Sequence, residues 1–307
     1  MKLSKILKHC RVDSPERFRI ADYHPAKDFG LPLDKEDAKA ILADGVRRLA
    51  DLQERLYAQD RWAVLVVLQA MDAAGKDSVI KHVMSGVNPL GCEVHPFKAP
   101  SEEELQHGFL WRAAMRLPRR GRIGIFNRSY YEEVLVVRVH PDLLAREKLP
   151  PQPFGKAFWK HRFREICDFE RNLVRNGTLV LKFHLRISKE EQRKRLLARL
   201  EEPGKRWKFS MGDVGERQLW NKYMDAYEDM IRSTSTSHAP WYVVPADHKH
   251  VAWLVVAEAI ISALEGLRLD FPKVEGKALK ELQAVERALK AEKSSGRSQL
   301  QGQAPAS

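Results

Sequence analysis

Cysteine is scarce in this chain, and the few cysteines that occur are widely spaced. The 307 residues contain three, Cys10, Cys92 and Cys167. An odd number at such spacing fits neither a disulfide framework nor a zinc-ligand pattern. Because disulfide-poor proteins are typical of reducing compartments, we expect the protein to work in the cytoplasm.

Long apolar runs are absent as well. The longest uncharged apolar runs are Trp62–Leu68 and Val251–Ala257, seven residues each, whereas a membrane-spanning helix needs about 18. The opening segment, MKLSKILKHC, is basic and has no apolar stretch of signal-peptide length. We therefore expect neither a membrane span nor a secretion signal.

Acidic residues are outnumbered. The chain has 53 lysines and arginines against 41 acidic residues, a net charge of +12. Such a surplus fits nucleic acid, a phosphate-rich substrate, an acidic membrane surface, or a solvated basic surface. Residues 105–131 contain no acid at all, which predicts either a solvated basic helix or a channel for a polyanion. The arginines of this stretch are Arg112, Arg116, Arg119, Arg120, Arg122 and Arg128.

Apolar segments alternate with amphipathic ones along the chain, which predicts an α/β domain with a five-stranded parallel sheet. The expected strands are 62–69, 92–97, 122–126, 178–185 and 241–244. The expected helices are 37–58, 76–85, 101–116, 130–139, 156–175, 188–200, 213–232 and 249–264. Residues 1–36 read as an irregular N-terminal arm over the domain 37–270. Residues 271–307 read as a charged helix followed by a disordered polar tail, SSGRSQLQGQAPAS.

The turn after the first strand has the features of a phosphate-binding loop. Residues 69–78 read QAMDAAGKDS, so a buried strand, a small-residue turn and a helix start follow one another. Two residues depart from the usual pattern, Ala70 in place of glycine and Asp77 in place of serine or threonine. Mg²⁺ would then depend on carboxylates and phosphates, with Asp72 as a candidate ligand. The alternative is a plain strand-to-helix turn at Gly75.

The third strand ends in polar residues. In phosphoryl-transfer folds this position delivers a metal-binding acid, and here it is occupied by Asn127. Glu132 and Glu133 follow closely and could supply the missing charge, while Arg128 could neutralise phosphate charge. An ordinary strand end with a surface arginine is the alternative.

A basic segment predicts a lid at about residues 186–215. Residues 186–208 hold nine lysines and arginines against four acids, and Pro203-Gly204 breaks the helix. Arg195 and Arg199 lie one helical turn apart and share a face, as a lid closing over phosphates would require. A solvated helix with ion pairs such as Glu190–Lys194 remains an alternative.

Five segments together resemble the polyphosphate kinase family of the second type. They span about residues 35–265 in family order: VLQAMDAAGKDSVIKHVMSGVNP, FNRSYYEEVLVVRVHP, SKEEQRKRLLARLEEPGKRWKFS, LWNKYMDAYEDMI and STSHAPWYVVPADHKHVA. The resemblance implies a three-layer P-loop kinase fold like thymidylate kinase, with a helical lid. It also implies reversible, Mg²⁺-dependent transfer of a phosphoryl group from inorganic polyphosphate to nucleotides, with Mn²⁺ as an alternative ion, in a homodimer or homotetramer.

By matching position, the resemblance also assigns site residues. The catalytic set is Asp72, Lys76, Asn127, Arg128 and Glu132, with Asp72 and Glu132 as metal ligands. The phosphate- and nucleotide-binding set is Met71, Ala73, Ala74, Gly75, Asp77, Ser78, Lys81, Arg195 and Arg199. Asn127 with Glu132 is similar to the subgroup that phosphorylates both AMP and ADP, and GMP and GDP are further candidate acceptors.

Two other functions share part of these features. An ATP-dependent nucleoside monophosphate kinase would share the loop but would not need the long arginine stretch. A non-enzymatic nucleic-acid binder would have no use for Asp72 or Glu132, and no aromatic residues interleave with the arginines. We therefore expect polyphosphate and nucleotides as partners, and neither nucleic acid nor membrane.

Overall fold

Five parallel strands form the centre of the computed structural model, which describes residues 3–31 and 35–300. The strand order is β2-β3-β1-β4-β5. The strands are β1 Ala63–Gln69, β2 Cys92–Pro96, β3 Ile123–Asn127, β4 Thr178–Arg186 and β5 Trp241–Pro245. All five lie within one residue of their predicted bounds, so the predicted parallel sheet is confirmed.

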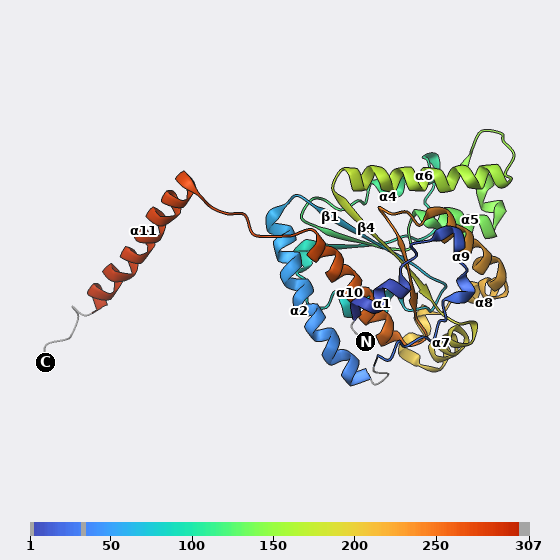
Figure 1. Cartoon of the computed structure of the whole chain (residues 1–307), viewed down its shortest axis with the longest axis horizontal. Coiled ribbons are helices and arrows are strands. Elements are labelled where there is room, and N and C mark those ends of the chain that lie inside the picture. Colours follow the sequence, from blue (N-terminus) through green and yellow to red (C-terminus); the bar gives the residue numbers. More distant parts are fainter. Residues whose placement is uncertain (1–2, 32–34, 301–307) are drawn as a thin grey trace. The chain divides into compact units, whose positions relative to one another are not determined.

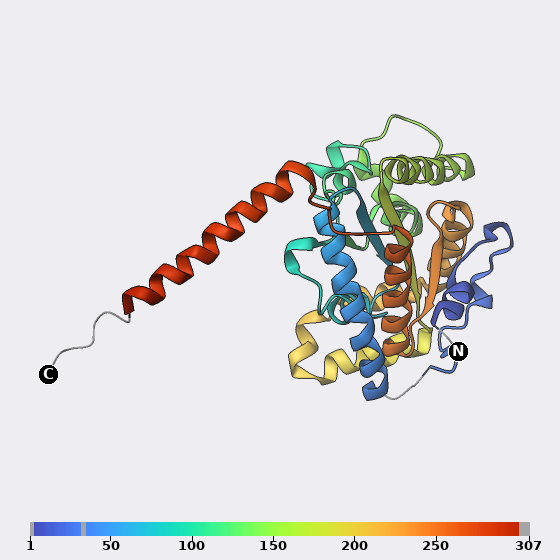
Figure 2. The same cartoon turned by 60° about the vertical axis from the view of Figure 1, so that its left-hand side comes forward.

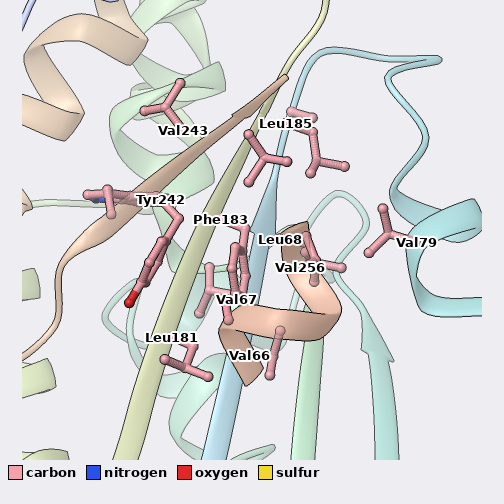
Figure 3. Close-up of a cluster of buried hydrophobic side chains, with 14 of the residues drawn as sticks. Val66, Val67, Leu68, Val79, Leu181, Phe183, Leu185, Tyr242, Val243 and Val256 are labelled. Atoms are coloured by element: carbon pink, nitrogen blue, oxygen red, sulfur yellow. The ribbon is translucent and has the colours of Figure 1, made fainter. Parts of the chain in front are cut away.

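Strand β1 lies in the middle of the sheet and is buried along its whole length. Its continuous apolar sequence is explained by cover on both faces, which leaves no position for a polar side chain to reach water. Figure 3 shows Val66, Val67 and Leu68 of β1 beside Phe183 of β4 and Val256 of a covering helix. This packing fixes the end of β1, from which the loop 70–75 departs.

Helices cover both faces of the sheet, which confirms the predicted three layers (Figures 1 and 2). One face carries α3 Lys76–Val83 and α10 Lys249–Gly266, with α2 Lys35–Gln59 packed on α10. The other face carries α5 Val136–Val139, α6 Lys156–Arg175 and α9 Trp220–Thr234. Residues 251–257 of α10 are apolar on every side of the helix because this part is buried between the sheet and other helices.

The N-terminal arm contains a helix that the sequence analysis does not predict. Helix α1, Leu3–Cys10, buries Ile6, Leu7 and Cys10 and packs on α10 and β5. The expectation of an irregular arm is therefore wrong for this part, because three apolar residues on one helix face are enough to dock a short helix. Two 3₁₀ turns follow, Pro15–Arg17 and Ile20–Asp22, and residues 32–34 lie outside the described part of the chain.

Three of the predicted helices are wrong, and two of them precede the lid. The segment 101–116 forms a 3₁₀ turn, Glu104–Gln106, and a short helix, α4 Trp111–Ala114. Its residues turn inward to line a pocket described below, and this tertiary role overrides the local helix signal. The segment 130–139 is likewise split into a 3₁₀ turn, Tyr130–Val134, and α5, since both tyrosine hydroxyls reach the same buried carboxylate of Glu170.

The predicted lid consists of α7 Lys189–Glu201, a 3₁₀ turn Pro203–Lys208 and α8 Met211–Gln218. Helix α7 ends before Pro203, as predicted. The single helix expected over 213–232 is wrong, because the chain bends at Leu219 between α8 and α9. No glycine or proline marks this bend in the sequence. Two further 3₁₀ turns are Pro89–Gly91 and Pro141–Glu147.

Residues 271–307 form a second structural unit. Helix α11 spans Gly276–Leu300, so the helix continues into the segment from Ser294 that the sequence analysis expects to be disordered. The remainder of that segment, 301–307, lies outside the described residues. Nowhere in the described ranges does a helix have the length and apolar character needed to cross a membrane. The three cysteine thiols are free.

Candidate active site

The loop between β1 and α3 lies at the carboxyl end of the sheet and leads into the N-terminus of α3. Two residues of the loop adopt left-handed backbone conformations, Ala73 at φ +61° and Gly75 at φ +111°. Glycine tolerates such a conformation at little cost, which explains Gly75 directly before the helix. The N-terminus of α3 then points its free N–H groups into the turn, and this arrangement attracts phosphate.

Side chains from this loop and from the end of β3 converge at one place. The Nη2 atom of Arg128 donates to Oδ1 of Asp72 at 2.6 Å, and Nη1 lies 3.9 Å from Oε2 of Glu132. The Nζ atom of Lys76 donates to the carbonyl oxygen of Ala70 at 2.9 Å. Because the carboxyl ends of parallel strands share one edge, residues far apart in sequence meet here, as the sequence analysis requires.

The charges in this cluster act on one another. Burial raises the pKa of Asp72, but Lys76 and Arg128 outweigh it and hold that pKa below its usual value. Burial lowers the pKa of Lys76, with Asp72 opposing. The pKa of Glu132 is raised by burial, against the opposing charges of Arg128 and Lys76. Asp72 is thus the carboxylate held most firmly in its charged form.

A basic cavity of about 480 Å³ opens above the loop, and we call it the phosphate cleft. Its walls come from the loop, the end of β3, the segment after β2, the lid and the start of α10. Seven cationic side chains line it against two aspartates, which is the charge balance that a polyanion requires. The cations are Lys76, Lys98, Arg128, Arg195, Arg199, Lys205 and Lys249.

Most of the predicted binding residues line the phosphate cleft. The ones that do are Asp72, Ala73, Ala74, Gly75, Lys76, Asp77, Ser78, Asn127, Arg128, Arg195 and Arg199. Asn127 donates from Nδ2 to Oδ1 of Asp77 at 2.9 Å. This hydrogen bond holds Asp77 at the end of β3. In the usual phosphate-binding loop a serine or threonine occupies the position of Asp77.

Two predicted binding residues are not brought to the cleft. Met71 is buried in the hydrophobic core and does not line the cleft. Lys81 is exposed on α3 and lines neither this cleft nor the pocket described next. The positions of both residues follow from the geometry of the loop. The cleft is lined by the loop itself and by the first turn of α3, and Met71 and Lys81 lie on either side of this part.

The predicted arginine channel is wrong for most of its members. Arg119, Arg120 and Arg122 precede β3 and therefore lie at the amino ends of the strands, opposite the cleft. The guanidinium of Arg122 covers the ring of Tyr57 at 5.1 Å. Of the six arginines, Arg112 and Arg128 line the cavities described here.

A second cavity of about 230 Å³ adjoins the cleft, and we call it the side pocket. It shares Lys98 and Arg128 with the phosphate cleft, and it balances four lysines and arginines with four glutamates among apolar side chains. Glu132 lies here rather than in the cleft, 3.9 Å from Arg128 at the boundary. The other polar and apolar residues that shape the pocket include Glu104, Leu105, Phe109, Arg112, Glu133, Val136 and Glu147.

Comparison with known proteins identifies the family. The family model described as polyphosphate kinase 2 matches residues 32–272. The chain belongs to the polyphosphate kinase 2 family. It is 52% identical over 276 residues to the ADP-polyphosphate phosphotransferase of Rhodopseudomonas palustris, covering 90% of this chain and 95% of that protein. It is 47% identical to the AMP/ADP-polyphosphate phosphotransferase of Meiothermus ruber, covering 88% and 97%.

A solved structure agrees with this assignment. The crystal structure of polyphosphate kinase 2 from Arthrobacter aurescens TC1 is 42% identical and superposes with a TM-score of 0.83, covering 95% of this chain and 97% of that one. The P-loop kinase fold expected from the sequence is thereby confirmed. The family resemblance that rested on five segments extends over nearly the whole chain.

Several cleft residues of this polyphosphate kinase 2 chain are missing from the sequence-based site. Lys98 lies two residues after the end of β2, and this position near a strand end is the signal that could have found it. Lys205 belongs to the basic lid segment, and Lys249 starts α10 after β5. Each of these lysines places a positive charge at the carboxyl edge of the sheet. They come together there because of the order of the strands in the sheet, which the periodicity of the sequence does not reveal.

The carboxylates of the site are few. Within the described ranges no three aspartate, glutamate, histidine or cysteine side chains cluster as a protein-only metal site would require. Asp72 and Glu132 are both held at Arg128, beside a cradle for phosphate oxygens. Mg²⁺ is commonly bound by one or two carboxylates together with substrate phosphates, so this donor set fits the predicted ion.

Proposed function

We propose that the protein transfers the terminal phosphoryl group of inorganic polyphosphate to AMP and to ADP. The observation that supports this most directly is the convergence of Lys76, Asp72 and Arg128 in a basic cleft beside a second, mixed pocket. Phosphoryl transfer needs little covalent help from a protein, and positioning with charge neutralisation supplies most of the catalysis.

Each part of the site has a role in this proposal. The phosphate cleft holds the end of the polyphosphate chain on the loop amides, with Lys76 and the lid arginines neutralising its charge. The side pocket takes the nucleoside of the acceptor, because its apolar walls and its balanced charge, four glutamates against four lysines and arginines, suit a base and sugar better than a polyanion. Arg128 and Lys98, which line both cavities, then contact the phosphates of both substrates.

The metal belongs to the same proposal. Asp72 and Glu132 are the residues that would hold Mg²⁺, or Mn²⁺ in its place, together with phosphate oxygens. The ion supplies charge that offsets the phosphates when it is bound. Arg128 keeps both carboxylates oriented toward the boundary between the two cavities.

A product assay tests the proposal. Purified protein is incubated with polyphosphate, Mg²⁺ and either AMP, ADP, GMP or GDP, and the nucleotides are separated by chromatography. We expect ADP and ATP from AMP, ATP from ADP, and polyphosphate formation from ATP in the reverse reaction. Product from AMP and ATP without polyphosphate, and none with polyphosphate, would instead establish an ATP-dependent monophosphate kinase.

Acceptance of guanine nucleotides, assembly as a homodimer or homotetramer, and a cytoplasmic location remain predictions from the sequence. The same assay decides the base preference, and light scattering of the purified protein decides the assembly.

A further inference from the structure

A third cavity lies outside the site described so far. It has a volume of about 640 Å³ and is enclosed by α1, the N-terminal arm and the ends of β4 and β5. We call it the arm cavity. Six lysine and arginine residues line it against two aspartates, Asp13 and Asp22. The cations are Lys8, Arg11, Arg17, Arg19, Lys27 and Arg186.

The walls of the arm cavity are held in place by backbone contacts. Val12 donates its N–H to the carbonyl oxygen of Trp241 on β5 at 2.9 Å. Ile20 donates its N–H to Oε2 of Glu228 on α9 at 2.9 Å. Figures 1 and 2 both show the arm, in dark blue, running beside α9 and α10. The cavity is therefore a built feature of the domain.

Its positive charges are only partly neutralised by the protein: Arg11 pairs with Asp13 at 2.8 Å and Arg17 lies 3.9 Å from Glu16. Within residues 3–31 and 35–300, no ion pair joins Lys8, Arg19 or Lys27 to an acid. Arg186 is half-buried, and its Nη1 atom lies 2.7 Å from the thioether sulfur of Met224. Unpaired positive charges around one cavity create a positive electrostatic potential that attracts anions.

Aromatic rings that line the cavity pack against one another. The rings of Phe18 and Tyr23 pack at 5.2 Å, and those of His9 and Phe29 stack at 6.1 Å. Single-stranded nucleic acids bind through free aromatic faces on which bases stack. The cavity therefore offers charge without base recognition, which favours an inorganic polyanion.

The arm cavity and the phosphate cleft share a wall. Pro245 lines the arm cavity and Lys249 lines the cleft, so the three-residue segment 246–248 between β5 and α10 separates them. Arg195 of the lid donates to the carbonyl oxygens of Ala246 and Asp247 within this segment. Arg186 and Pro245, the last residues of β4 and β5, line the arm cavity, so it lies at the same carboxyl edge of the sheet as the phosphate cleft.

We propose that the arm cavity is a second binding site for polyphosphate, which holds a distal stretch of a long chain while its end lies in the phosphate cleft. This rests on the proposed function, in which polyphosphate is the donor. Binding at two linked sites raises the apparent affinity for long chains without any new contact at the reacting end. Short chains, which reach the cleft alone, gain nothing from the arm.

The test compares two charge-matched double variants. Arg19→Gln with Lys27→Gln removes two exposed cations of the arm cavity that hold no other residue in place. The control, Arg61→Gln with Arg175→Gln, removes two exposed cations near the amino ends of the strands. Steady-state kinetics with ADP are measured on a long-chain polyphosphate and on a short oligophosphate.

We expect the arm variant to raise the KM for long chains by about tenfold, since two phosphate contacts are lost. The slope of log KM against log salt should fall by about two, one for each contact. The KM for the short oligophosphate, kcat and the control variant should be unchanged. Equal effects on long and short chains, or none on either, would overturn the proposal.

Two further measurements distinguish the arm site from the proposed function and from a nucleic-acid site. Turnover of the short oligophosphate by the unaltered protein tests the proposed function alone, so its failure is distinct from failure of the arm site. Direct binding of single-stranded RNA is compared with that of long polyphosphate. RNA binding of equal strength that disappears in the arm variant would make the cavity a nucleic-acid site and overturn the proposal.

Discussion

Lys76 is the residue on which the phosphate cleft depends most. Its ammonium group lies against the loop carbonyl of Ala70 and beside Asp72, at the first position of α3. Burial lowers the pKa of Lys76, and the neighbouring charge of Asp72 opposes this shift. A cation at this buried position attracts phosphate more strongly than a cation in water does, because little solvent screens its charge.

Replacing Lys76 with alanine should therefore slow turnover by about 10²–10³-fold, the usual effect of losing one charge complement in the transition state. The measurement is kcat with saturating polyphosphate and ADP. The melting temperature serves as the control for folding, because Lys76 donates to the backbone carbonyl oxygens of Ala70 and Met71 rather than to a core side chain. Near-normal kcat in a folded variant would refute the assignment of the loop.

Asp72 is expected to act in two ways, as the partner of Arg128 and as a ligand of Mg²⁺. Asp72→Asn should reduce activity by about 10²-fold at a fixed Mg²⁺ concentration. Part of the activity should return as Mg²⁺ is raised, since an amide oxygen is a weaker ligand. A Mg²⁺ titration of the rate measures this, and chelation by EDTA should abolish activity in both proteins. An unchanged Mg²⁺ dependence would leave Asp72 with the ion-pair role alone.

At the scale of elements, the lid helix α7 is joined to the phosphate-binding loop by Arg195. Its Nη1 atom donates to the carbonyl oxygens of Ala73 at 3.2 Å and Ala74 at 2.9 Å, and Nη2 reaches the segment after β5. Arg199, one turn later, pairs with Asp213 of α8 at 3.3 Å. The two lid arginines therefore differ in how freely they can turn to a substrate.

The two arginines should respond differently to substitution. Arg199→Ala should mainly raise the KM for polyphosphate and flatten its salt dependence, because one phosphate contact is lost. Arg195→Ala should lower both kcat and the melting temperature, since the loop carbonyls and the wall at Ala246 lose a shared donor. Kinetics and thermal melts of both variants measure this. Identical profiles would show that Arg195 acts as a simple phosphate ligand.

Some elements of the fold are predictable from the sequence, and others are not. The buried strand β1 and the turn after it were predictable, because an uninterrupted apolar run and a Gly-Lys step are local signals. The helix expected at 101–116 failed, since its residues are shaped by the side pocket they line. Lys98 and Lys249 were missed because their meeting depends on strand order, which no local pattern encodes.

At the scale of the whole molecule, a buried polar network connects the helix layer to the sheet. Lys182 of β4 donates to Glu170 of α6 at 2.6 Å, and both side chains are fully buried. The hydroxyls of Tyr130 and Tyr131 donate to the other oxygen of Glu170 at 2.8 and 2.7 Å. These tyrosines directly precede Glu132, so the network fixes the segment that carries this predicted metal ligand.

Breaking this network should destabilise the fold strongly. Lys182→Met leaves the charge of Glu170 buried without a counter-ion, and we expect a loss of about 3–5 kcal/mol in the free energy of unfolding. The double variant Lys182→Met with Glu170→Gln should recover part of this loss, because no charge then remains buried. Urea denaturation measures both. A loss below about 1 kcal/mol for the single variant would contradict the energetic role of the pair.

The second unit should be dispensable for catalysis. Among the described residues, every member of the hydrophobic core lies before residue 270, the last being Leu269, and all three cavities are lined by residues of the first unit. A chain ending at Asp270 should therefore keep its free energy of unfolding within about 0.5 kcal/mol, as expected where no core contact is removed. Its kcat should be unchanged, as should that of a chain ending at Glu292. Light scattering on the same samples measures their assembly state. A truncated chain that dissociates and loses activity would contradict this prediction and show that α11 contributes to an active assembly.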